Sequence, residues 1–434
     1  MRRLAFMLLR TLGYWSVVPL IILIQLAYLG RKKNLLVWGP DPIINNKYWS
    51  EAMKEAGWSS VTLMATYYSA INRREDYDLY FENLVSGVRP ALLARELAPI
   101  FAHLYIARHA AVVHIPFFGG ALGKTPIWRL EAFFYRLAGV KTVVLPYGAD
   151  AFMYSQIQDL GVRHALLLSY PAAARDEARI AKRVHYWVRR ADVVVVGYTP
   201  DGIGRWDVAP LNKVCIDSSL WKTKTTYSDK DGRNGAVRIM HAPNHRGTKG
   251  TEFLVEAVEQ LRREGLTVDL VLAERRQNEE IRAMMQDVDV LADQFLLPGY
   301  GLAAIEGMAS GLPVMANLGS ESYTRVFRRW SFLDECPILT VSPESLVENL
   351  RLLITNPELR RQLGQAGRAY IEKYHSYAAA QYLFGSIYRK ILGGEDVDLM
   401  NLFHPIKSEY VRSHFKVTHP LVENRLPSDS ALRC

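Results

Sequence analysis

The sequence predicts two tandem α/β domains with parallel sheets, preceded by a membrane-associated N-terminal helix. Two observations support this fold class. Short apolar runs alternate with longer helical stretches, first in one half of the chain and again in the other, as in doubly wound α/β domains. The N-terminal stretch TLGYWSVVPLIILIQLAYLG carries no charge. The length of 434 residues suits about two or three domains.

Composition and charge narrow the class of partner. With 49% hydrophobic and 22% charged residues, the chain has an ordinary globular composition. Its net charge of +9 suits an anionic membrane surface or phosphate-bearing substrates. No basic run is interleaved with aromatic residues, so we expect no nucleic-acid partner. The three cysteines, Cys215, Cys336 and Cys434, are widely spaced and do not have the spacing of a metal site. Their number and spacing favour a reducing compartment.

Residues 1–33 are predicted to form a membrane segment. A helix of about 20 residues spans roughly 30 Å, the thickness of the hydrocarbon layer. Positive residues flank the apolar stretch on both sides and leave its orientation open. Pro19 interrupts the helical hydrogen bonds near the middle. The segment is therefore either a single span with a tolerated proline or a re-entrant hairpin with both ends in the cytoplasm.

The first α/β domain is expected over residues 34–222. Its buried parallel strands are predicted at NLLVWGP, VTLMA, AAVVHIP, KTVVLPYG and ADVVVVGY. Between them, YWSEAMKEAG and RDEARIAKRVHYWVRRA have the pattern of helices. The polar, turn-rich stretch TKTTYSDKDGRNGA predicts a linker over residues 223–236.

The second α/β domain is expected over residues 237–378, followed by a closing helix at 379–395 and a polar tail at 396–434. Its predicted strands are VRIMHAPN, VDLVLAE, VDVLADQF, LPVMAN and ILTVS, and amphipathic stretches such as GTEFLVEAVEQLRREG lie between them. Ligands of such sheets bind at the carboxyl ends of the strands, so we expect the site in a cleft between the two domains.

The stretch DQFLLPGYGLAAIEGMASGLPVMAN is the most informative part of the second domain. Gly299 and Gly301, on either side of Tyr300, permit a tight turn before a short helix that begins near Leu302. The free N–H groups at the start of that helix suit a diphosphate. Glu306 lies inside the apolar helix and needs partners, which two ribose hydroxyls would supply. The alternative is a structural carboxylate that holds a neighbouring loop.

This stretch, Pro-Gly-Tyr-Gly-Leu-x3-Glu-Gly-Met-Ala-Ser-Gly-Leu-Pro-Val, resembles the nucleotide-sugar signature of family-4 glycosyltransferases. The resemblance extends over residues 34–392 and implies the GT-B fold of two facing Rossmann-like domains. It also implies sugar transfer from a nucleoside diphosphate with retention and without a bound metal. Glu306 matches the acidic residue that holds the ribose, whereas Pro298 stands where the family has its first acidic residue.

A second cluster, HAPNHRGTKGTEF, lies where a strand passes into a helix. In the family, an arginine and a lysine at this turn bind the leaving diphosphate, which implies catalytic roles for Arg246 and Lys249. Cations are needed there because negative charge grows on the diphosphate as the glycosidic bond breaks. Asn244, on the same turn, is expected to contact the donor together with Gly299, Tyr300, Gly301 and Leu302. The alternative is a solvated basic turn.

In the first domain, family members often carry His-Gly-x-Asp after a strand, with the histidine touching the sugar. Tyr147 stands in place of that histidine, and Gly148 and Asp150 match. His114, at the end of AAVVHIP, is either a substrate contact or a core histidine with satisfied hydrogen bonds, and the sequence does not separate the two. We therefore expect Tyr147 and Asp150, and His114 under the first alternative, on the sugar or acceptor side.

The stretch HIPFFGGALGKT resembles a phosphate-binding P-loop at its end, but Phe118 stands where the first glycine is required. We expect Gly119 and Gly120 to form a cleft-facing loop near the acceptor. A P-loop NTPase remains the weaker alternative.

The sequence thus predicts a membrane-associated glycosyltransferase that uses a nucleotide sugar and needs no metal or other cofactor. Its acceptor is expected to be a lipid-linked saccharide, because the chain carries its own membrane segment. The catalytic domains are expected to face the cytoplasm at a bacterial inner membrane. The other class of protein to consider is a glycosyltransferase-like protein that binds a nucleotide sugar or a partner without catalysis.

Overall fold

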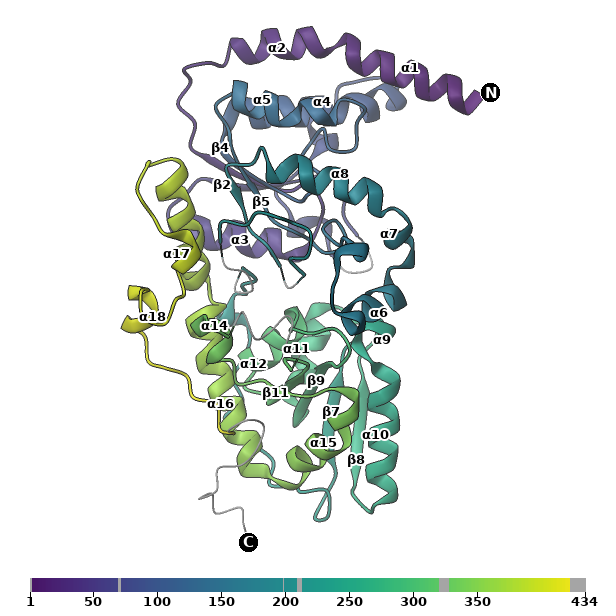
Figure 1. Cartoon of the computed structure of the whole chain (residues 1–434), viewed down its shortest axis with the longest axis vertical. Coiled ribbons are helices and arrows are strands. Elements are labelled where there is room, and N and C mark those ends of the chain that lie inside the picture. The colour runs from purple at the N-terminus through teal and green to yellow at the C-terminus, as the bar shows by residue number, and fades with distance from the viewer. Residues whose placement is uncertain (1, 69–71, 198, 209–212, 320–327, 422–434) are drawn as a thin grey trace. The chain divides into compact units, whose positions relative to one another are not determined.

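The computed structural model describes residues 2–68, 72–197, 199–208, 213–319 and 328–421 (Figure 1). The chain forms two compact units, each assembled from separate segments. Unit 1 consists of Met1–Met153, Arg175–Ala209 and Gln381–Met400. Unit 2 consists of Tyr154–Ala174, Pro210–Ala380 and Asn401–Cys434.

Unit 1 contains a six-stranded parallel sheet in the order β3-β2-β1-β4-β5-β6. The strands are β3 (Leu79–Tyr80), β2 (Ser60–Met64), β1 (Leu35–Trp38), β4 (Ala110–Ile115), β5 (Lys141–Val144) and β6 (Val193–Val194). The helices are α3 (Ile44–Glu55), α4 (Ala91–His109), α5 (Glu131–Leu137) and α8 (Glu177–Val188). Figure 1 shows α4 and α5 on one side of the sheet and α3 on the other, so both faces are covered.

Unit 2 contains a five-stranded parallel sheet in the order β11-β10-β9-β7-β8. The strands are β11 (Leu339–Thr340), β10 (Val314–Ala316), β9 (Val290–Gln294), β7 (Val237–His241) and β8 (Val268–Leu272). The helices of unit 2, wholly or for most of their length, are α6 (Leu160–Ser169), α7 (Pro171–Arg175), α9 (Arg246–Lys249), α10 (Thr251–Arg263), α11 (Asn278–Gln286), α12 (Leu302–Ala309), α14 (Ser331–Asp334), α15 (Leu346–Thr355), α16 (Pro357–Tyr374) and α18 (Glu409–Ser413).

The apolar runs of the sequence form the strands for a simple reason. A strand in the middle of a parallel sheet is buried on both faces, so nearly all its residues are apolar. Every residue of β4 and β9 is buried. In unit 2, the apolar faces of α10 and α15 complete the core with residues such as Leu254, Val258 and Leu350. The structure thus confirms the predicted fold class, two α/β units with parallel sheets.

The boundaries of the two units differ from those expected from the sequence. Helix α6, expected in the first domain, packs on α9 in unit 2, where Thr248 Oγ1 donates to the Ala165 carbonyl oxygen at 3.1 Å. The expected linker also packs on unit 2, since Lys224 N donates to the Ser310 carbonyl oxygen at 3.0 Å. The expected closing helix is part of α17 (Tyr377–Ile391), which begins in unit 2 and ends in unit 1. Residues 422–434 of the expected tail lie outside the described residues.

The N-terminal segment forms two consecutive helices, α1 (Arg2–Ser16) and α2 (Val18–Leu26), with Pro19 in the first turn of α2. Figure 1 shows them running along α4 and α5. Tyr14 OH donates to the Glu96 carbonyl oxygen at 2.7 Å, and Gln25 Nε2 lies 2.8 Å from His103 Nε2 in the core. Residues Ala5–Leu26 are long and apolar enough to cross a membrane by length and composition.

Candidate active site

The loop after β9 presents the start of α12. Gly299 has a φ of +107°, which favours glycine, and its N–H donates to the Asn317 carbonyl oxygen at 2.7 Å. Gly301 is the N-cap of α12, and no side chain of the described residues caps this helix end. The N–H of Gly301 itself donates to Asp293 Oδ2 at 3.4 Å. The N–H groups of the first turn of α12, which begins at Leu302, have no side-chain acceptor among the described residues and can bind an anion.

Lys249 lies beside this helix start. Its Nζ forms an ion pair with the Asp293 carboxylate and donates to Gln294 Oε1 at 3.2 Å. A Cβ atom built on Gly301 would lie 4.0 Å from Lys249 Nζ, so the ammonium group is close to the N-cap of α12. Lys249 is 9% exposed and Asp293 is 3% exposed. A cation and a helix N-terminus thus converge on one small region.

Glu306 is buried inside α12, with 5% of its surface exposed. Its Oε1 accepts a hydrogen bond from Asn278 Nδ2 at 2.9 Å, from the first turn of α11. Burial raises the pKa of Glu306 to about 8, although the Asn278 hydrogen bond and the nearby Arg282 act in the opposite direction. At neutral pH without ligand, this carboxyl group is therefore mostly protonated.

Arg246 points to different partners from those of Lys249. It is exposed and donates to Glu252 Oε1 at 2.8 Å through Nε and to Glu274 Oε1 at 2.6 Å through a terminal nitrogen. These two hydrogen bonds, the one to Glu274 foremost, raise the pKa of Arg246. Asn244 is exposed on the turn before α9. The two cations expected to act together thus pair with separate carboxylates.

Tyr300 turns into the core of unit 2. It is 4% exposed, and its hydroxyl lies 2.7 Å from Tyr370 OH and 3.0 Å from His375 Nε2. The side chain therefore anchors the loop to α16, and only the backbone of this residue belongs to the loop surface.

Sequence reasoning left two parts of this arrangement open. The sequence indicates no role for Asp293 and Gln294 at the end of β9, or for Asn278 in α11. The sequence could have indicated Asp293 and Gln294, because polar residues at the end of a fully buried strand need a local partner. Nothing in the sequence pairs Asn278 with Glu306, which lies 28 positions away.

In unit 1, His114 is a core residue. Its Nδ1 lies 3.1 Å from the Val37 carbonyl oxygen, its Nε2 lies 2.9 Å from Tyr388 OH, and its ring stacks on Trp38 with a centroid distance of 3.5 Å. Burial lowers its pKa to about 3. Both ring nitrogens are engaged, so the structure supports the core alternative for this histidine.

The glycine-rich loop after β4 encloses a carboxylate of the chain itself. Gly120 N and Leu122 N donate to the two oxygens of Glu131 at 3.0 and 2.8 Å, and Tyr135 OH donates to Glu131 Oε1 at 3.0 Å. A Cβ atom on Gly119 would lie 2.7 Å from the same carboxylate. The amides that a P-loop offers to phosphate are therefore occupied by Glu131, which is the physical argument against the NTPase alternative.

Asp150 and Tyr147 are held by backbone contacts near the ends of β4 and β5. Asp150 accepts from Phe117 N and Tyr147 N at 2.9 Å and from Gly148 N at 2.8 Å. Tyr147 OH donates to Asn46 Oδ1 at 2.8 Å, and burial raises the pKa of this hydroxyl. Asp150 thus joins two loops of unit 1, and the carboxyl ends of these strands form one surface.

Residues 256–370 match the family model described as glycosyl transferases group 1. No curated protein matches the chain significantly. Among solved structures, sucrose-phosphate synthase from Thermosynechococcus elongatus is similar, with 16% identity, 84% of this chain and 100% of that chain covered, and a TM-score of 0.50. WaaG, a glycosyltransferase of lipopolysaccharide biosynthesis, is also similar, with 15% identity, 80% and 97% coverage, and a TM-score of 0.44.

These comparisons confirm the predicted resemblance to GT-B glycosyltransferases and the two-domain fold. The family match, which extends over residues 256–370, also confirms the prediction of a glycosyltransferase enzyme. The matched region contains α12 and ends within α16. The residue roles, the metal-free reaction and the acceptor stay predictions.

Proposed function

We propose that this glycosyltransferase moves a sugar from a nucleoside-diphosphate donor to a lipid-linked saccharide, with retention at the anomeric carbon and without a bound metal. One observation carries the donor part of the proposal. The uncapped start of α12, the ammonium group of Lys249 and the buried carboxyl group of Glu306 lie together in unit 2. An anion-binding helix end beside a cation suits a diphosphate, and a buried carboxyl group suits ribose hydroxyls.

The expected chemistry follows from where charge develops. As the bond from sugar to diphosphate breaks, negative charge grows on the leaving oxygen. Lys249 and the first N–H groups of α12 stabilise that charge without reorganising, because Asp293 already holds the ammonium group in place. Asp293 is therefore a positioning residue for Lys249. Pro298, at the position of the family's first acidic residue, is buried and offers no charge to the sugar.

The membrane part of the proposal rests on the N-terminal segment. Its outward side exposes large apolar side chains, among them Leu12 at 67% and Leu23 at 64%. Contacts to α4 extend from Arg10, in the middle of α1, to Gln25, near the end of α2. A helix that crosses the bilayer would separate from unit 1 and lose contacts of this kind. The contacts therefore favour a segment that lies along the cytoplasmic surface of the membrane, with both ends on one side.

Replacing Leu12 and Leu23 by lysine should release the protein from vesicles, because each lysine would have to enter the apolar layer. The measurement is flotation with liposomes. In the matched control, lysine replaces Leu160 and Ile406, which are 73% and 74% exposed but lie outside this segment, and this variant should stay bound. Equal binding of both variants would show that the segment is not the anchor.

A topology reporter fused before residue 2 is a second test. If the reporter lies on the far side of the membrane from the catalytic units, the segment spans the membrane.

The donor proposal is tested by thermal unfolding of the whole chain with a panel of nucleoside-diphosphate sugars. A donor at 100 times its Kd should stabilise the native state by about 2.7 kcal/mol. Transfer to extracted lipid-linked saccharides is then measured with the donor that stabilises most. Stabilisation without transfer to any acceptor would favour the noncatalytic binding protein, and no stabilisation by any member of the panel would refute the donor site.

A further inference from the structure

Unit 1 contains a pocket that the donor site does not use. It has a volume of about 530 Å³, within the range of small-molecule sites. Its buried floor includes Phe81, Val85, Ala98 and Ala121. Pro40, Ala65 and Gly120, which follow β1, β2 and β4, contribute to its wall. The pocket thus lies at the carboxyl ends of the parallel strands, where ligands of such sheets bind.

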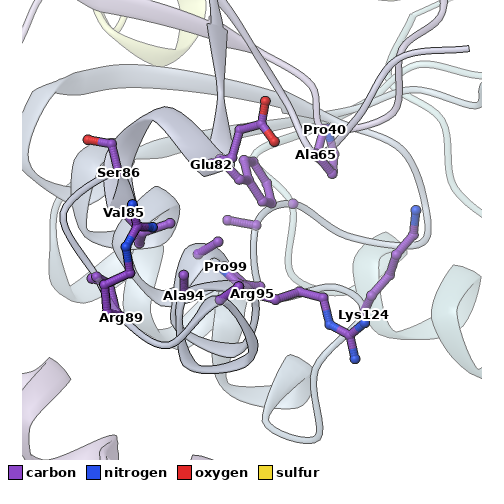
Figure 2. Close-up of a pocket in the computed structure, with 16 residues that line it drawn as sticks. Pro40, Ala65, Glu82, Val85, Ser86, Arg89, Ala94, Arg95, Pro99 and Lys124 are labelled. Atoms are coloured by element: carbon purple, nitrogen blue, oxygen red, sulfur yellow. The ribbon is translucent and has the colours of Figure 1, made fainter. Parts of the chain in front are cut away.

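Three cations surround this largely apolar pocket. Figure 2 shows Arg89 on one side and Arg95 and Lys124 on the other. Arg89 and Arg95 are exposed, and neither has a hydrogen-bond or ion-pair partner among the described residues. Lys124 Nζ is paired with Asp41 Oδ1 at 2.7 Å. Among the described residues that line the pocket, Glu82 carries the one carboxylate, and it forms an ion pair with Arg74.

This distribution of charge favours an anionic group. Two guanidinium groups without partners offer paired N–H donors of the kind that phosphate oxygens accept. The start of α4, whose residues Ala91 and Ala94 line the pocket, adds the positive end of a 19-residue helix. The apolar floor would accept the less polar part of the same ligand.

Helix α4 also connects the pocket to the membrane segment. Ala94 and Ala98 face the pocket, whereas Ile100 and His103, on the other side of the helix, contact the N-terminal segment. The pocket and the bilayer-facing segment are therefore separated by one helix, about 10–12 Å across. A lipid beside this segment is therefore close to the pocket.

We propose that this pocket binds the diphosphate and the adjoining apolar part of a lipid-linked acceptor, with Arg89 and Arg95 holding the phosphate oxygens. The inference rests on the proposed function and names the chemical class of its acceptor. The rest of the lipid chain remains in the bilayer beside α1 and α2. An inorganic diphosphate shares the anionic chemistry, but it would not use the apolar floor or the neighbouring membrane segment.

The experiment measures binding of three probes to the full-length chain in neutral detergent micelles: a polyprenyl diphosphate, phosphatidylglycerol and inorganic diphosphate. The variant Arg89→Ala/Arg95→Ala should weaken binding of the polyprenyl diphosphate by about tenfold or more for each lost charged contact. The variant Ala94→Trp, which fills the pocket without changing charge, should weaken it as well. The control Arg175→Ala/Arg189→Ala removes the same charge from other exposed positions of unit 1 and should bind normally.

Thermal unfolding of each variant confirms that the fold is intact before binding is compared. Unchanged polyprenyl diphosphate binding in both pocket variants would overturn the proposal. So would an equal loss of phosphatidylglycerol binding, which would indicate a general membrane surface, or equally tight binding of inorganic diphosphate to the unmodified protein. Nucleotide-sugar binding serves as the separate test. If the unmodified chain binds the lipid in this pocket but binds no nucleotide sugar, the proposed function is wrong and the lipid-binding pocket is still supported.

Discussion

Replacing Lys249 by methionine and Asp293 by asparagine in one variant is expected to slow sugar transfer at least about a hundredfold while the fold stays intact. Loss of one preorganised electrostatic contact to a developing anion typically costs this much. Donor affinity should fall less, because the diphosphate is already charged in the bound donor and the additional negative charge on its leaving oxygen develops only in the transition state. Single-turnover transfer and donor titration separate the two effects.

Both residues are changed together because they are buried as an ion pair. Lys249→Met alone leaves the Asp293 carboxylate unpaired, which costs about 3–5 kcal/mol and confuses stability with catalysis. The control is Arg351→Met/Glu264→Gln, which removes an exposed ion pair with an N–O distance of 2.7 Å from the same unit. Its transfer rate should be unchanged and its stability altered by no more than about 1 kcal/mol. If the double variant at Lys249 and Asp293 transfers sugar at the normal rate, the diphosphate does not bind at this position.

Glu306→Gln is expected to weaken donor binding about tenfold or more and, at pH 8, to make the protein without ligand more stable. The loss of binding follows because a carboxylate accepts hydrogen bonds from both ribose hydroxyls, whereas the glutamine amide nitrogen only donates. If binding requires the ionised form, the unmodified protein should release a proton on binding, and its donor affinity should rise as the pH approaches about 8.

The gain in stability follows from the pKa of Glu306. The pKa is about 8 in the folded chain and near 4.5 in the unfolded chain, so the unfolded state binds fewer protons between these values. The stability of the unmodified protein therefore falls as the pH rises through this window, by on the order of a few kcal/mol for this group. Glutamine has no proton to lose, so the advantage of the variant is absent at pH 4.5 and complete above pH 8.

Urea unfolding at pH 5 and pH 8, combined with donor titration, checks both effects. The matched control Glu256→Gln changes an exposed glutamate of α10 and should alter neither quantity. If Glu306→Gln gains stability but binds donor normally, Glu306 is a structural carboxyl group that holds α11 through Asn278.

The sequence predicted the framework of the fold because parallel strands leave a strong pattern. Runs such as AAVVHI and VLADQ are buried on both faces and show no competing helical period. Strand β3 was not predicted, because two residues, Leu79 and Tyr80, are too few to show any period. The division into units was also beyond the sequence, since it depends on which surface α6 and α17 pack against and not on their own composition.

The candidate site was predictable where one residue violates its local pattern. A glutamate in an apolar helix and two glycines before it are such violations, and they led to Glu306 and the loop before α12. The partners were not predictable, because Lys249 and Asp293, or Glu306 and Asn278, meet only after the sheet has formed. For His114, the sequence left two alternatives, and only the contacts with Val37 and Tyr388 separate them.

The late return of α17 to unit 1 has a consequence for how the chain folds during synthesis on a ribosome. Phe384 packs edge-on against Trp38 with a centroid distance of 4.9 Å, and Tyr388 OH bonds to His114, 274 positions earlier. Unit 1 therefore lacks part of its aromatic core until most of unit 2 has been translated. A nascent chain released after residue 380 would expose Trp38 and leave His114 Nε2 unpaired, and such a fragment is a natural target for chaperones and proteases.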